Sequence, residues 1–158
     1  MKNRDEGEIK RALKYSYRLL ALRDRGQTEL IERLTKRGFH RDVVEDTVRQ
    51  LKDMGYINDS RLAETLIRTA LEQKHYGKYA ITTYLRSKGI DDSIVENLDL
   101  CNEDYISSAR RFVKKKLKTM KAIDADERVK RLSTMLQRRG HDFDTIREVL
   151  KEGGSEDV

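Results

Sequence analysis

The hexapeptide LTKRGF at residues 34–39 recurs twice along the chain, as LRSKGI at residues 85–90 and as LQRRGH at residues 136–141. The three glycines lie 51 residues apart. The same offset relates other apolar positions, namely Leu30 to Ile81 and Leu132, and Val44 to Val95 and Ile146. Self-similarity at a fixed period is the sequence signature of a repeat protein. We therefore predict three copies of one unit.

Each hexapeptide is predicted to end a helix. Apolar residues at helical spacing lead to a basic residue and then to glycine, which readily takes the left-handed backbone found after many helices. This ending is the Schellman motif, in which the residue after the glycine packs against the residue four positions before the glycine. Phe39 should therefore contact Leu34, and Ile90 should contact Leu85.

The pattern around each glycine predicts three helices per unit. We expect helices at residues 9–24, 28–37, 41–54, 59–74, 78–88, 91–98, 103–121, 126–139 and 142–151. The three copies should span residues 1–55, 56–100 and 101–152, and a disordered tail should follow at residues 153–158. The predicted fold is all-α, with three tandem three-helix repeats in an elongated, curved arrangement.

Composition agrees with a string of small helical units. Residues of the set AVILMFWYC make up 37% of the chain and charged residues 39%, and there is no proline or tryptophan. So little apolar material favours thin local cores, and few residues in the chain break helices. The net charge of +6 favours a polyanionic partner such as nucleic acid.

The compartment is predicted from what the sequence lacks. Cys101 is the single cysteine, and the sequence contains neither a secretory signal nor an apolar run of membrane-spanning length. We expect a soluble, cytoplasmic monomer with no membrane partner.

Two helices joined by a glycine turn resemble the helix-turn-helix of transcription factors. In each of the three copies, however, the helix after the glycine turn is acidic. It carries Asp42, Glu45, Asp46 and Asp53, then Asp91, Asp92, Glu96 and Asp99, then Asp142, Asp144, Glu148 and Glu152. Phosphates repel carboxylates, so these helices are not expected to read bases. Asp91 and Asp142 are expected to cap helix starts instead.

Positive charge gathers in the third copy, where the stretch between Tyr105 and His141 contains twelve basic residues and three acidic ones. On the predicted helix at 103–121, one apolar stripe leaves the cations on the remaining surface; it consists of Ile106, Ala109, Val113, Leu117 and Met120. The residues predicted to contact phosphates of DNA, or of a protein–DNA filament, are Arg110, Arg111, Lys114, Lys115, Lys118, Lys121, Arg131, Arg138, Arg139, Lys88 and Arg37.

Other interpretations of these cations stay open. Arg37, Lys88 and Arg139 would also interact favourably with the dipoles of the helices that they end. Each such interaction stabilises a helix by about 0.3–1 kcal/mol. The charge run is also compatible with a solvated face, with a helix held by a partner, or with a helix lying on a membrane. Membrane insertion is the weaker of these, because among the basic residues of that helix Phe112 alone supplies aromatic bulk.

The sequence offers almost no basis for catalysis. His40, His75 and His141 are scattered, and Cys101 has no cysteine or histidine companion. Phosphate-binding glycine loops, nucleophile elbows and metal-ligand spacings are absent from the sequence. We therefore expect a protein that is not an enzyme and needs no metal or cofactor.

An ordered series of motifs resembles the RecX family of recombinase regulators. The motifs are LLALR at 19–23, Glu29-Leu30 through Leu34 to Gly38-Phe39, GYIND at 55–59 leading into RLAE at 61–64, KGID at 88–91 and LQRRG at 136–140. The resemblance runs from about residue 12 to residue 150. It implies a tandem three-helix repeat protein that binds the RecA filament and, weakly and without sequence preference, single- and double-stranded DNA. It also implies inhibition of ATP hydrolysis and strand exchange in DNA repair, recombination and the SOS response.

Two departures from the family pattern carry expectations of their own. Gly26 stands where the family often has a Ser or Thr cap, so the start of the following helix is expected to fray. His141 stands in place of the usual phenylalanine, so the third turn should lose its apolar closure unless Phe143 takes over.

Two different classes of function also remain open on the residues alone. One is a plain DNA-binding protein that acts without a recombinase, and the other is a helical-repeat adaptor for an unrelated acidic protein. The sequence also leaves open whether such a regulator inhibits or assists its recombinase.

Overall fold

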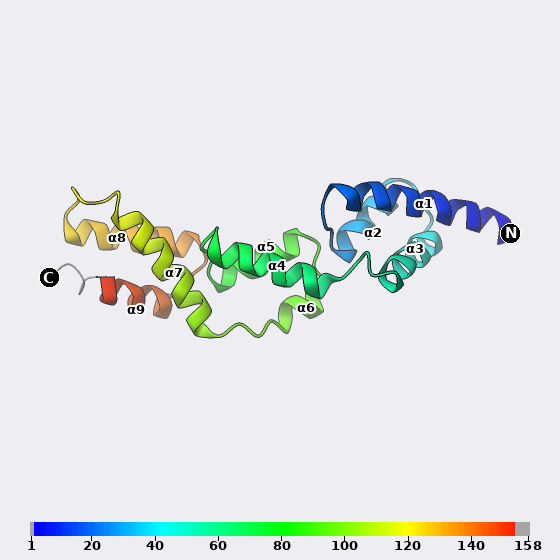
Figure 1. The fold of residues 1–158 in the computed structure, drawn as a ribbon. Helices are drawn as coiled ribbons and strands as arrows, with labels where there is room; N and C mark the ends of the chain where they lie inside the picture. Colours follow the sequence, from blue (N-terminus) through cyan, green and yellow to red (C-terminus); the bar gives the residue numbers. More distant parts are fainter. Residues whose placement is uncertain (1, 154–158) are drawn as a thin grey trace. The chain divides into compact units, whose positions relative to one another are not determined.

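A computed structural model describes the backbone of residues 2–153 and the side chains of residues 6–151. All regular secondary structure in this part of the chain is helical, which confirms the all-α prediction (Figure 1). The helices are α1 (Lys2–Leu22), α2 (Gln27–Lys36), α3 (Arg41–Asp53), α4 (Asp59–Glu72), α5 (Lys78–Ser87), α6 (Asp92–Glu96), α7 (Asn102–Leu117), α8 (Ala125–Arg138) and α9 (Phe143–Gly153).

The largest differences from the predicted helices lie at chain ends and at one buried turn. α1 begins at Lys2 rather than at residue 9, because residues 2–8 contain no apolar side chain and the apolar spacing could not locate that part of the helix. α7 ends at Leu117, and the N–H of Met120 donates to the Leu117 carbonyl at 3.1 Å in a turn that buries Met120. Gly153 ends α9 rather than opening a tail, and residues 154–158 lie outside the described part.

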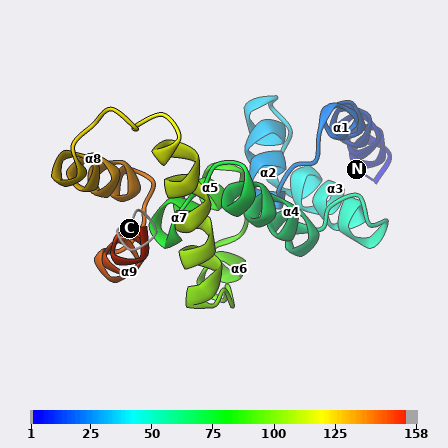
Figure 2. The same ribbon diagram turned by 60° about the vertical axis from the view of Figure 1, so that its left-hand side comes forward.

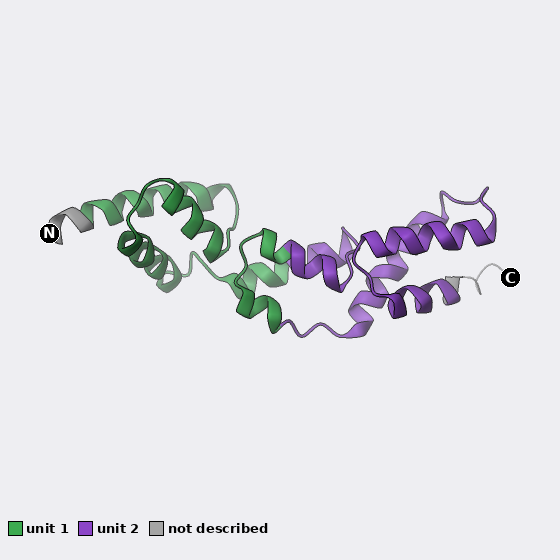
Figure 3. Cartoon of the chain, turned by 180° about the vertical axis from the view of Figure 1, so that it is seen from behind, with its two compact units in different colours: residues 1–65, 85–97 green, residues 66–84, 98–158 purple. Residues whose placement is uncertain are grey.

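The chain forms two compact units (Figure 3). Unit 1 comprises residues 1–65 and 85–97, and unit 2 comprises residues 66–84 and 98–158. α4 and α5 therefore each contribute one part to unit 1 and the other to unit 2. The compact units thus cut through the middle copy, and the boundaries of the three copies at residues 55 and 100 stay a prediction.

In each unit, the third helix of a sequence copy packs against the first two. In unit 1, α3 packs on α1 and α2, and in unit 2, α9 packs on α7 and α8 (Figure 2). The buried core of unit 1 consists of Ala12, Leu19, Leu30, Leu34, Val43, Val44, Val48, Leu51 and Ile57. That of unit 2 consists of Ile106, Ala109, Phe112, Val113, Met120, Leu132, Leu136, Ile146 and Val149. Both cores are small, as the composition predicts.

The three glycine turns have the predicted Schellman geometry. Gly38, Gly89 and Gly140 have φ of +94°, +74° and +79°. The N–H of the following residue donates to the carbonyl five residues earlier at 3.2–3.3 Å, as from Phe39 to Leu34. These bonds satisfy carbonyl groups that the ends of α2, α5 and α8 would otherwise leave unpaired.

Unit 1 contains a close contact between the start of α2 and the glycine turn after α5. A methyl group added to Gly26 would overlap the carbonyl oxygen of Gly89, and one added to Gly89 would lie 2.7 Å from the Glu29 nitrogen. Asp59 bridges the same contact, because its carboxylate accepts the N–H of Gln27 at 2.9 Å and that of Asp91 at 3.4 Å. Hence α2 does receive a cap, from a distant residue, and this contact removes the reason to expect fraying.

Unit 2 repeats this contact between the start of α5 and the glycine turn after α8. A methyl group added to Gly77 would lie 2.5 Å from the Gly140 carbonyl oxygen. Here the backbones also bond directly, since the N–H of Gly77 donates to the Arg139 carbonyl at 2.8 Å and that of Tyr79 donates to the Gly140 carbonyl at 3.2 Å. Glycine is therefore required on both sides by close approach of two backbones.

His141 itself closes the third turn, and Phe143 does not replace it. The His141 side chain is buried, whereas Phe143 is 69% exposed. His141 Nε2 lies 3.0 Å from the His75 carbonyl oxygen, and because a carbonyl only accepts, Nε2 carries the proton. Burial lowers the pKa of His141 below its ordinary 6.5. Burial, reinforced by the charge of Arg139, likewise lowers the pKa of His75.

Alanine at Gly89 or Gly140 should destabilise the protein more than alanine at Gly55, which has a similar backbone conformation but open space around it. Gly55 has a φ of +77°, and no atom lies within 4 Å of where an added methyl group would sit, so Gly55→Ala carries only the strain of a left-handed alanine, about 1–2 kcal/mol. Gly89→Ala and Gly140→Ala add a steric clash and should lose about 1–3 kcal/mol more in urea unfolding. Equal losses for all three variants would show that the junctions are not tightly packed.

Stability should fall as the pH drops from 7.5 to 5.5. Folding lowers the pKa of His75 and His141 below 6.5, so the unfolded chain binds more protons than the folded chain as the pH falls through 6.5, and protonation favours unfolding. His141→Phe should reduce this loss, and His40→Gln, at an exposed position, should not. The measurement is the free energy of unfolding in urea at both pH values. An undiminished loss in His141→Phe would contradict the assignment to His141.

Candidate functional site

α7 separates its apolar and basic residues onto opposite faces. The predicted apolar stripe lies in the core of unit 2, with Ala109 and Val113 buried and Leu117 packed against the core. Arg111, Lys114, Lys115 and Lys118 follow one another at spacings of 3, 1 and 3, which places them on the side of the helix opposite that stripe. The helix therefore presents a row of positive charge to solvent.

Three lysines of this row and one lysine just beyond it are exposed and make no ion pair among the described residues. They are Lys114, Lys115, Lys118 and Lys121, and they occupy the last turn of α7 and the turn after it. We refer to them as the α7 lysine row. Each ammonium group is a compact, strongly hydrated charge on a flexible stem. Such groups suit contacts to phosphates whose positions vary, which require charge but not fixed geometry.

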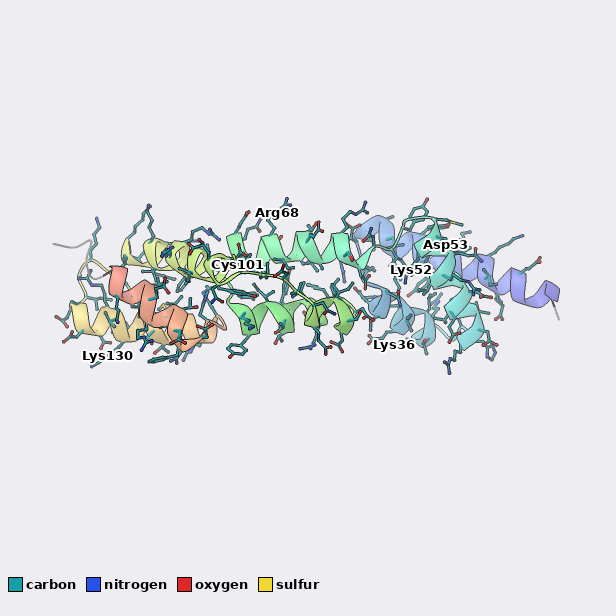
Figure 4. The ribbon with its side chains drawn as sticks, turned by 90° about the horizontal axis from the view of Figure 1, so that it is seen from below. Lys36, Lys52, Asp53, Arg68, Cys101 and Lys130 are labelled. Atoms are coloured by element: carbon teal, nitrogen blue, oxygen red, sulfur yellow. The ribbon has the colours of Figure 1, made fainter. Side chains whose placement is uncertain are left out.

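α8 adds fewer available cations. Arg138 is exposed in its last turn and has no ion-pair partner among the described side chains. Arg131 is also exposed, but it donates to Glu127 at 2.7 Å. Lys130 is exposed on the same helix (Figure 4), although it was not among the residues predicted to contact phosphates.

Three predicted contact residues make structural interactions within unit 2. Arg110 pairs with Glu103 at 2.8 Å and lies 3.8 Å from Glu148, which links α7 to α9. Arg111 donates to the Leu71 carbonyl at 3.3 Å. Arg139 donates to the Lys74 carbonyl, and its guanidinium lies 4.4 Å from the centre of the Phe112 ring. Their role as contacts to DNA stays a prediction, weaker for Arg139 than for the α7 lysine row.

The remaining two predicted contact residues belong to unit 1. Arg37 is exposed at the end of α2, where its guanidinium lies 5.5 Å from the centre of the Tyr15 ring. Lys88 is half-buried after α5. The predicted residues of α7 and α8 therefore belong to unit 2, whereas Arg37 and Lys88 belong to unit 1.

Unit 1 contains a second basic site, which was not predicted from the sequence. An open hollow of about 340 Å³ between α1 and the Gly38 turn is lined by Glu8, Arg11, Lys14, Tyr15, Arg18, Arg37, Gly38 and Phe39. Four cations therefore face one carboxylate. The spacing of Arg11, Lys14 and Arg18, at 3 and 4 residues, is the signal that could have revealed this face of α1.

The described residues also bear on catalysis and membranes. No group of three His, Cys, Asp or Glu side chains among them is arranged to hold a metal ion. The Cys101 thiol is exposed at the start of α7, 3.2 Å from the Asp104 carboxylate. None of the described helices has the length and apolar content needed to cross a membrane.

Family models match all three copies in order. The model of the first three-helix domain of RecX matches residues 6–51, that of the second domain matches residues 58–97, and that of the third matches residues 103–150. Each match contains one of the three glycine turns described above.

Relatives and solved structures agree with these matches. Regulatory protein RecX of Chlorobaculum tepidum is 33% identical over 148 residues, covering 93% of this chain and 91% of that protein. The RecX of Mycobacterium sp. strain KMS is 35% identical over 145 residues, covering 88% and 77%. The crystal structure of RecX from Lactobacillus salivarius shares the fold, with a TM-score of 0.81 at 21% identity over 93% of this chain and 97% of that one. The chain therefore belongs to the RecX family of regulatory proteins.

Proposed function

We propose that this chain is a non-catalytic regulator of the RecA recombinase. It binds the RecA–DNA filament in the cytoplasm and lowers ATP hydrolysis, filament growth and strand exchange. One observation carries the proposal: a member of the RecX family presents the α7 lysine row, four exposed cations without ion-pair partners among the described residues.

The geometry of the α7 lysine row supports weak, sequence-independent contact with DNA. Lys114 and Lys115 lie on the side of α7 opposite the buried stripe, and the other two lysines follow the end of the helix. Such exposed ammonium groups can contact backbone phosphates without reaching base edges. The acidic helices α3, α6 and α9 are poorly suited to enter a groove of DNA. Asp91 and Asp142 are used as caps, since Asp91 accepts the Ser93 N–H at 2.9 Å and Asp142 accepts the Thr145 N–H at 2.8 Å.

The proposal includes a monomer. α2 and α5 begin after Gly26 and Gly77, whereas α8 begins after Asp124. Because a side chain at that position is incompatible with the contact that joins consecutive copies, a second molecule is not expected to continue the series at α8.

The protein should lower the single-stranded-DNA-dependent ATPase activity of RecA at less than one molecule per RecA. A regulator that lodges on a filament acts on many subunits from one position, so inhibition should begin well below equal concentrations. The measurement is a titration of the protein into RecA on single-stranded DNA, with filament length followed by electron microscopy. The proposal fails if ATPase activity, filament length and strand exchange are all unchanged.

Reversing three charges of the α7 lysine row should weaken binding and reduce its salt dependence. Removing three phosphate contacts should lower the slope of log affinity against log salt by about 2 for single-stranded DNA. The variant is Lys114→Glu, Lys115→Glu and Lys118→Glu, measured by fluorescence anisotropy with DNA and with RecA–DNA filaments. Helicity should be unchanged in circular dichroism, because all three side chains are exposed.

A matched control separates local contacts from net charge. Lys52→Glu, Arg68→Glu and Lys78→Glu change the net charge equally at exposed positions outside α7, the first two of which are labelled in Figure 4. The control should retain most of its affinity. Equal loss of affinity in both variants would show that the α7 lysine row contributes only through the net charge of the protein. Binding to DNA without measurable affinity for RecA would favour the plain DNA-binding function.

A further inference from the structure

The Gly38 turn of unit 1 has the same structure as two turns that each hold the start of a helix. After α2, α5 and α8, the N–H of the glycine donates to the carbonyl three residues earlier at 2.9–3.0 Å. The N–H of the residue after the glycine donates to the carbonyl five residues before it at 3.2–3.3 Å. Gly89 is occupied by the first turn of α2, and Gly140 by the first turn of α5. At Gly38, no atom lies within 4 Å of the position of an added methyl group.

The two occupied turns show what such a turn accepts. Each holds the N-terminal turn of a helix that is preceded by glycine, Gly26 for α2 and Gly77 for α5. At Gly140, the incoming helix donates its first N–H groups to the Arg139 and Gly140 carbonyls. The equivalent carbonyls of Arg37 and Gly38 accept no backbone hydrogen bond among the described residues.

The side chains around the Gly38 turn add a charge requirement. Arg37 corresponds to Arg139, which donates to the carbonyl of Lys74 at the end of the neighbouring helix segment. Arg37 instead projects beside Tyr15, and Arg11, Lys14 and Arg18 line the same hollow with Glu8 as the one carboxylate. Because the site is basic, it favours a helix that carries carboxylates in its first turn.

We propose that the Gly38 turn is a docking site for the N-terminal turn of a helix in a partner protein. The helix has glycine at its N-cap and acidic residues in its first turn. Its leading N–H groups bond to the Arg37 and Gly38 carbonyls, and its carboxylates pair with the cations of α1 and with Arg37.

A second copy of this chain fits the site poorly. The helix start that follows α2 and α5 in the series is that of α8, whose N-cap is Asp124. The Asp124 side chain already accepts the Asp126 N–H at 3.1 Å, and its Cβ would occupy the space in which Gly26 and Gly77 have only hydrogen. The occupant is therefore a different protein.

The test is a titration of ¹⁵N-labelled full-length protein with two helical peptides of about 16 residues, a length at which alanine-rich helices form. One has glycine at the N-cap and three glutamates in the first turn, and the other has serine in place of that glycine. Serine is the better cap in an isolated helix, so the second peptide is at least as helical. The glycine peptide should nevertheless bind more tightly and shift the amide signals of Gly38 and Phe39 but not that of Gly55.

Paired variants locate the contact. Gly38→Ala and Gly55→Ala carry a similar backbone strain, with φ of +94° and +77° and open space around each, so their stabilities should be comparable. Gly38→Ala should bind the glycine peptide about tenfold more weakly, because its methyl group would meet the incoming backbone as it would at Gly89. Gly55→Ala should bind like the unaltered chain. Arg18→Glu, at an exposed position, should also weaken binding even if Gly38→Ala does not fold.

Three results would overturn the proposal. Equal binding of the glycine and serine peptides would exclude recognition of a glycine-started helix. Displacement of the peptide by inorganic phosphate at similar concentration would make the hollow an anion site. Self-association that Gly38→Ala abolishes would make the occupant a second copy of the chain.

Discussion

The structure depends on the approach of one backbone to another at two pairs of glycines, Gly26 with Gly89 and Gly77 with Gly140. Each pair brings the start of one copy's second helix onto the turn that ends the next copy's second helix. The local cores are thin, so a copy cannot bury enough apolar surface alone and gains stability from its neighbours, as in other repeat proteins. The middle copy shows this dependence most clearly, because its helices α4 and α5 are shared between the two compact units.

The junctions also determine which charges are available for binding. In unit 2, Arg139 donates to a carbonyl of the neighbouring segment and stacks on Phe112, and Arg111 donates to another carbonyl. Arginine suits these tasks because its planar guanidinium donates in fixed directions and packs on aromatic rings. The cations that stay available on α7 are lysines. Their charge reaches phosphate without a fixed geometry, which is compatible with a regulator that binds along DNA without reading its sequence.

The two ends of the repeat series are chemically different. Gly38, at the first copy, keeps the turn that receives a helix, with its carbonyls open and cations around it. The third copy lacks the complementary glycine, and Asp124 caps its own helix. Under the proposals made above, a second copy is not expected to extend the series, and the Gly38 turn stays available to a different partner. The same turn is thus an internal joint at Gly89 and Gly140 and a surface feature at Gly38.

Much of the local structure was determined by the sequence alone, because helices and their glycine turns depend on residues close together in the chain. The 51-residue period, the three Schellman turns and the apolar stripe of α7 were all predicted correctly. The sequence could not show that Asp59 caps α2 from 32 residues away, that His141 is buried against His75, or that Arg139 is held at a junction. Those roles depend on which segments meet in space, so only the tertiary structure decides how a charge is used. Arg139 donates to the Lys74 carbonyl of a neighbouring segment, whereas Arg37, at the equivalent position, is exposed beside Tyr15.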